Sequence, residues 1–152
     1  MVGGASAVRG PPSLSRAIMV RVRRIEPERG MAALRRALAR AAGDPVSHEH
    51  QAIPEHDEMT AVRWTLGLLE ERHPGRSVEV RVPPAGAVQV LDGPTHRRGT
   101  PANVIETTPT TWLRLAAGQL TWDDAVHQGL VAASGVRADL SAVLPVVEIE
   151  EP

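Results

Sequence analysis

The chain has 152 residues, enough for one domain with a buried core, and its 17 basic and 18 acidic side chains nearly cancel. The absence of Cys excludes disulfides, thiol nucleophiles and thiolate metal ligands, and it favours a cytoplasmic location. Because Phe and Tyr are also absent, the core depends on aliphatic side chains and three Trp, and no apolar run approaches the ~20 residues of a membrane-spanning helix.

Residues 1–18 are rich in Gly, Pro, Ser and Ala, and we predict a disordered leader rather than a signal peptide, because no apolar stretch forms there. Residues 1–40 hold nine Arg against two Glu. We interpret this excess as a solvated basic surface, with transient contact with an anionic membrane surface as the alternative. No nucleic-acid partner is expected, since aromatic residues that would stack on bases are not interleaved with the Arg.

Two helices are predicted in the N-terminal half. The first covers residues 27–42, where Leu34 and Leu38 share an apolar face, and it ends at Gly43. The second covers residues 58–72, with Asp57 as its N-cap. Between them, residues 44–57 are predicted to form a polar loop. Its His and acidic residues match no familiar zinc spacing, so we expect neither a metal nor a cofactor. The residues of this His/acid cluster are His48, Glu49, His50, Glu55, His56, Asp57 and Glu58.

The middle of the chain predicts a hairpin and a third strand. Residues 77–82 alternate between apolar and charged side chains, and residues 87–91 return after a turn rich in Pro and Gly. Residues 95–101 are predicted to form a basic loop. Residues 103–107 are predicted to form the third strand.

The C-terminal third predicts two short helices, a strand and a final helical turn. Thr108 is expected to cap a helix that stops at Gly118, and Thr121 a helix that stops at Gly129. Residues 130–135 form the strand, and residues 137–144 form a helical turn before Pro145. These elements together predict an α+β fold, with helices packed on one face of a mostly antiparallel sheet.

This order of residues resembles the sterol carrier protein 2 family. The positions that carry the resemblance at the C-terminal end are Gly118, Leu120, Ala125, Gly129, Val131, Gly135 and Leu140. A longer string resembles the bacterial proteins described as the sterol carrier family: Val80–Pro84, Gly86–Gln89, Gly93–Pro94, His96, Arg98–Pro101, Asn103–Val104, Glu106–Thr107 and Thr111–Leu113. The resemblance covers residues 58–145 and implies a sheet of about five strands. We expect a single domain over residues 19–147 and an acidic tail over residues 148–152.

The resemblance implies a non-catalytic carrier that holds a lipid, a fatty acyl chain or another apolar small molecule between the sheet and the helices. The residues predicted to line that cavity are Val80, Val88, Val90, Trp112, Leu113, Leu120, Val131 and Leu140. Each could instead fill a packed core. The residues predicted at a polar rim are His96, Arg98, Asn103 and Glu106, and Glu106 could pair with Arg81 or Arg98.

Two other functions stay open. The chain could be an enzyme-associated or substrate-binding module, as the related domains fused to mycothiol-dependent isomerases are. It could also be a protein-interaction module whose pocket is filled. No catalytic residue is predicted, since the sequence has no nucleophile-elbow motif and no phosphate-binding loop.

Overall fold

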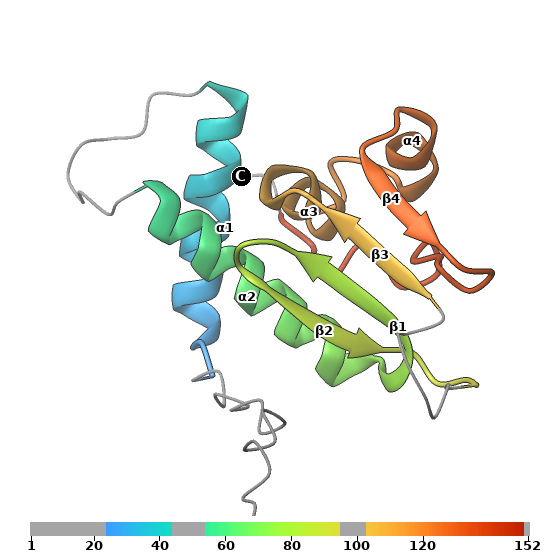
Figure 1. Ribbon diagram of the computed structural model, residues 1–152. Helices are drawn as coiled ribbons and strands as arrows, with labels where there is room; N and C mark the ends of the chain where they lie inside the picture. Colours follow the sequence, from blue (N-terminus) through green and yellow to red (C-terminus); the bar gives the residue numbers. More distant parts are fainter. Residues whose placement is uncertain (1–23, 44–53, 95–102, 151–152) are drawn as a thin grey trace, which may run out of the picture.

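The computed structural model describes residues 24–43, 54–94 and 103–150, and its α+β architecture confirms the predicted fold class (Figure 1). The helices are α1 (Pro27–Ala42), α2 (Pro54–Arg72), α3 (Pro109–Ala116) and α4 (Trp122–His127). The strands are β1 (Pro74–Val82), β2 (Gly86–Val90), β3 (Val104–Thr107) and β4 (Val131–Ser134). In Figure 1, α2 runs behind the hairpin of β1 and β2, and α4 lies beside β4.

The sheet of the described residues has four strands in the order β2-β1-β3-β4, one fewer than the expected five or so, and it is mixed: two of its three strand pairs are antiparallel. The β1–β2 and β3–β4 pairs are antiparallel, whereas β1 and β3 are parallel. The parallel pair follows from strand placement. Because β2 reverses the direction of β1 and β3 reverses it again, a third strand placed beside β1 must run parallel to β1.

Local sequence signals set the ends of the C-terminal helices as predicted. The hydroxyl of Thr108 accepts a hydrogen bond from the Thr111 amide, and that of Thr121 accepts one from the Asp124 amide. Gly118 and Gly129, which follow these helices, have φ angles of 75° and 69°. These left-handed conformations favour glycine and stop each helix.

Two boundaries differ from prediction. Helix α2 begins at Pro54 rather than residue 58, since Pro is well suited to the first helical turn, and Asp57 therefore lies inside the helix instead of capping it. Residues 137–144 form separate turns rather than a helix. There the carboxylate of Asp139 accepts a hydrogen bond from the Ser141 amide at 2.8 Å, which competes with helical bonding.

The core lies between the sheet and α1, α2 and α3. Val78, Val80 and Val82 point from β1 into this core, as their alternation predicts, and are at most 1% exposed. Trp112 of α3 is fully buried, and its indole N–H donates to the hydroxyl of Thr65 in α2 at 2.9 Å. This bond satisfies the one polar atom of the largest fully buried side chain.

A buried carboxylate joins α1 to α2. Asp57 is 2% exposed and accepts two hydrogen bonds from Arg36, at 3.0 and 2.9 Å, and one from Arg40 at 2.8 Å. Bonding to Arg36 is the main reason that the pKa of Asp57 lies below its ordinary value. The first two helices are therefore held together by charge as well as by apolar packing.

Within the parts of the chain that the structure describes, no helix is both long and apolar enough to cross a membrane.

Candidate functional site

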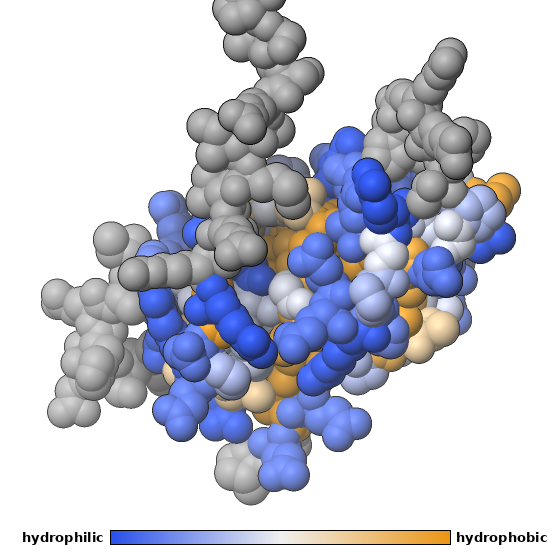
Figure 2. Space-filling view, turned by 90° about the horizontal axis from the view of Figure 1, so that it is seen from below, coloured by the Kyte–Doolittle hydropathy of each residue, from blue (hydrophilic) through white to orange (hydrophobic). Residues whose placement is uncertain are grey.

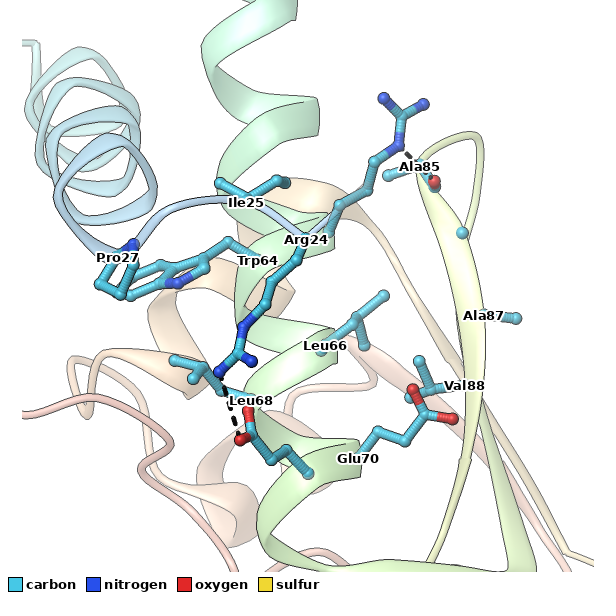
Figure 3. Close-up of a pocket in the computed structure, with 14 residues that line it drawn as sticks. Arg24, Ile25, Pro27, Trp64, Leu66, Leu68, Glu70, Ala85, Ala87 and Val88 are labelled. Atoms are coloured by element: carbon cyan, nitrogen blue, oxygen red, sulfur yellow. Dashed lines mark hydrogen bonds and ion pairs between the residues drawn. The ribbon is translucent and has the colours of Figure 1, made fainter. Parts of the chain in front are cut away.

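A cleft of ≈ 330 Å³ lies between α2 and the edge strand β2 (Figure 3). Its α2 wall carries Trp64, Leu66 and Leu68, and its other wall is the segment Ala85–Val88. Arg24, Ile25 and Pro27, which precede and begin α1, border it on the third side. Figure 2 shows that, on the face seen there, apolar surface is limited to patches between hydrophilic side chains. The cleft is therefore a mainly apolar hollow with a charged border.

The hollow exists because side chains are missing from both walls. Gly67 of α2 and Gly86 of β2 line the cleft, and a Cβ atom added at either would meet no heavy atom within 4 Å. Ala85 and Ala87 flank Gly86 and add only one methyl group each. A larger side chain at Gly67 would project into space that is now open.

Trp64 forms the end wall of the cleft and is held from behind by a glycine. It is 8% exposed, and a Cβ atom added to Gly30 of α1 would lie only 2.1 Å from its Cδ2 atom. The indole of Trp64 thus rests directly on the backbone of α1. Gly30 and Gly67 both lie inside helices, but Gly30 is in close contact with a buried side chain and Gly67 faces open space.

This contrast predicts opposite effects of the same substitution. We expect Gly67→Ala to stabilise the protein by about 0.5–1 kcal/mol, because alanine restricts the unfolded chain and meets open space in the helix. Gly30→Ala is the matched variant, and we expect it to be destabilising, because its methyl group would overlap the buried indole of Trp64. Urea unfolding measures both changes. Equal effects would contradict this description of the two sites.

Four charged side chains border the cleft. Arg24 and Glu71 form an exposed ion pair at 3.5 Å, which contributes little to stability. The Nε–H of Arg63 donates to the carbonyl of Ala85 at 2.9 Å, marked by the dashed line near Ala85 in Figure 3. Across the described ranges, neither Arg63 nor Glu70 makes an ion pair. These two charges are available to a ligand.

A second cleft, of ≈ 280 Å³, lies where α1, α2 and α3 meet. Arg40, Glu55 and Glu58 are the charged residues at its border, and Glu58 already accepts a hydrogen bond from Thr110 at 2.9 Å. Glu55, His56 and Asp57 were predicted in the polar loop but belong to α2. No group of three or more His, Asp or Glu among the described residues is placed to hold a metal ion, and His48 and His50 lie outside these residues.

The predicted lining residues are distributed over three places. Val88 borders the first cleft and Leu113 the second. Val131 is half-buried. The others are buried in the packed core: Val80, Val90, Trp112, Leu120 and Leu140. That these eight side chains contact a ligand stays a prediction.

Of the predicted polar rim, the two residues that the structure describes, Asn103 and Glu106, do not line the first cleft. Asn103 is buried, donating to the carbonyl of Ser77 at 2.8 Å and accepting from the amide of Arg137 at 2.9 Å, so it links the start of β3 to β1 and to the turn after β4. Glu106 is exposed. One of its two expected partners, Arg81, instead bonds Glu79 at 2.6 Å, because Arg81 and Glu79 lie two residues apart in β1 and so on the same face of the strand.

The other two rim residues, His96 and Arg98, fall outside the described residues, as does the predicted leader. Sequence reasoning missed Arg63, Trp64 and Gly67 as cleft residues. One signal for them exists: a glycine inside a helical pattern, which often marks a packing or functional requirement.

A comparison with known protein families finds a match to this chain. The model of a protein family described as "Bacterial SCP ortholog" matches residues 55–146, which is more than half of the chain. No curated protein matches the chain. The matched range includes β2 and all of α2 except its first residue, and these two elements are the main walls of the first cleft.

Proposed function

Since the chain belongs to the family of bacterial SCP orthologs, we propose that it is a non-catalytic binding or carrier protein for an apolar small molecule, and that the cleft between α2 and β2 holds this molecule. The observation that carries the proposal is the open apolar lining of that cleft. Burial of apolar ligand surface there would yield about 25 cal/mol per Å² without any specific polar contact.

The size of the cleft favours a slender ligand. Its ≈ 330 Å³ lies at the lower end of the roughly 300–1,000 Å³ typical of small-molecule sites. A single acyl chain suits this space better than a rigid polycyclic molecule. A ligand bound instead among Val80, Val90 and Trp112 would have to displace packed core side chains.

A series of alkyl ligands of increasing length tests the proposal. Each methylene buried in the cleft is worth about 0.8 kcal/mol, so we expect Kd to fall about fourfold per methylene until the cleft is full. Titration followed by Trp emission measures this, because Trp64 lines the cleft while Trp112 and Trp122 do not. In Trp64→Phe the emission change should be lost while calorimetry still detects binding.

Gly67 provides the matched variants. Gly67→Leu should fill the cleft and weaken binding at least tenfold, whereas Gly67→Ala should change Kd little. Equal binding by wild type and Gly67→Leu would exclude this cleft as the site. If no alkyl ligand binds wild-type protein at all, the proposed function is wrong.

A second candidate, a protein-interaction module with a filled pocket, is favoured by the tight packing around Trp112. The enzyme-associated alternative requires polar residues that converge on one site. Among the described residues, Glu106 is exposed and Asn103 is occupied by backbone bonds, so these two do not support that alternative.

We also propose that residues 19–147 form one domain. Its support is that α1 is tied to α2 through Asp57, and that Val146 and Val147 are at most 7% exposed and belong to the main core.

A further inference from the structure

Charge is ordered along the length of the cleft between α2 and β2. Arg63, Leu66, Gly67 and Glu70 line it at positions i, i+3, i+4 and i+7 of α2, which is one stripe of a helix. Arg63 and Glu70 are seven residues apart, or about 10 Å along the helix axis. The cleft therefore has a basic end, an apolar middle and an acidic end.

The basic end is held in place by the backbone. The Nε–H of Arg63 is engaged by the carbonyl of Ala85 at 2.9 Å, on the opposite wall of the cleft. The two Nη groups of Arg63 make no hydrogen bond to any described residue. A guanidinium fixed at one edge with its fork free is suited to two-pronged contact with a carboxylate or phosphate.

The other charges of the cleft reinforce this assignment. Arg24, the second cation, is already paired with Glu71. Glu70 borders the cleft near Val88 (Figure 3) and would repel an anion placed at that end. An anionic group is therefore attracted to Arg63 and repelled by Glu70. A bound chain with an anionic group at one end would lie in the cleft in one orientation only.

We propose that the ligand is a single-chain amphiphile with an oxyanion head, that Arg63 binds the head, and that the tail lies over Leu66 and Gly67 towards Glu70. This inference rests on the proposed function, because it names the ligand class of the same cleft. Carboxylate and phosphate heads share the required chemistry.

Three probes with the same tail test the inference on the full chain: dodecanoate, dodecyl phosphate and dodecanol. We expect the two anions to bind wild-type protein about tenfold more tightly than dodecanol. This gain in affinity is at the low end for a charge-assisted hydrogen bond, because the site is open to water. The tighter of the two anions identifies the head. Raising the salt concentration should weaken binding of the anions and leave dodecanol unchanged.

The variant Arg63→Gln should lower the affinity for both anions to that for dodecanol, and it should leave the affinity for dodecanol unchanged. The matched control is Arg76→Gln, which removes an exposed Arg of β1 that does not line the cleft, and it should change none of the three affinities. If all three probes bind wild type equally, the head assignment is overturned while the proposed function stands. If none binds, both fail. The salt series uses wild type alone, so binding of the anions that does not depend on salt would overturn the head contact even if Arg63→Gln does not fold.

Discussion

Replacing Trp112 with alanine is expected to lower the free energy of unfolding by about 4 kcal/mol. The side chain is fully buried between α3 and α2, so the substitution removes a large apolar surface and leaves a cavity. The variant also removes the donor that bonds the hydroxyl of Thr65. Since a domain of this size has a total stability of only about 5–15 kcal/mol, this single change should bring the protein close to unfolding.

Urea unfolding followed by circular dichroism measures this effect, and Trp112→Phe is its control. Phenylalanine keeps most of the apolar volume and loses only the bond to Thr65, whose hydroxyl still donates to the Ala61 carbonyl at 2.8 Å. We expect a loss of about 1–2 kcal/mol for this variant. A loss below 1 kcal/mol for Trp112→Ala would mean that the residue does not fill the core as described.

Replacing Asp57 with alanine is expected to cost about 2–3 kcal/mol. Removing the carboxylate leaves two adjacent cations, Arg36 and Arg40, without a counter-charge between α1 and α2. Breaking a fully buried pair costs about 3–5 kcal/mol, and the Arg side chains here are 34% and 24% exposed, so water offsets part of the loss. The control is Glu148→Ala, which removes an exposed acid and should change stability by less than about 0.5 kcal/mol.

Asp57 also makes stability depend on pH. Its pKa is lowered in the folded protein, chiefly by hydrogen bonding from Arg36, whereas the unfolded chain has a pKa of about 3.9. The unfolded state therefore binds more protons near pH 4, and the contribution of Asp57 is present above that pH and is lost as the pH falls through the folded pKa. Urea unfolding between pH 2.5 and 6 should show this loss in wild type and a shallower dependence in Asp57→Asn. Identical pH profiles would contradict the assignment.

Elements governed by neighbouring residues were predictable from the sequence. Thr108 and Gly118 act on backbone groups within one turn of themselves, so their roles can be derived from local spacing. The parallel pairing of β1 with β3 could not be derived in this way, because both sides of β1 offer the same backbone groups. Its alternating Val residues indicate which face is buried and do not indicate which strand lies beside it.

The candidate site was less predictable than the fold. Burial of Val80 and Trp112 follows from their patterns, but a pattern does not distinguish packing against protein from packing against a ligand. The cleft depends on Gly67 lying opposite Gly86, two residues whose proximity arises only in the folded chain. A glycine adds no side chain to the apolar pattern of a helix or strand, so the sequence pattern did not indicate either wall of the cleft.

The sheet order also has a consequence for how the chain folds. Helices α1 and α2 and the β1–β2 hairpin are contiguous in sequence, and β3, α3, α4 and β4 form a second contiguous half. The halves meet along the parallel β1–β3 ladder and where α2 packs on α3. The β1–β2 hairpin closes a short loop, whereas the β1–β3 and β3–β4 ladders both join residues about 25 positions apart or more. The hairpin is therefore expected to form early, and the pairing of β3 with both of its neighbours is expected to limit the folding rate.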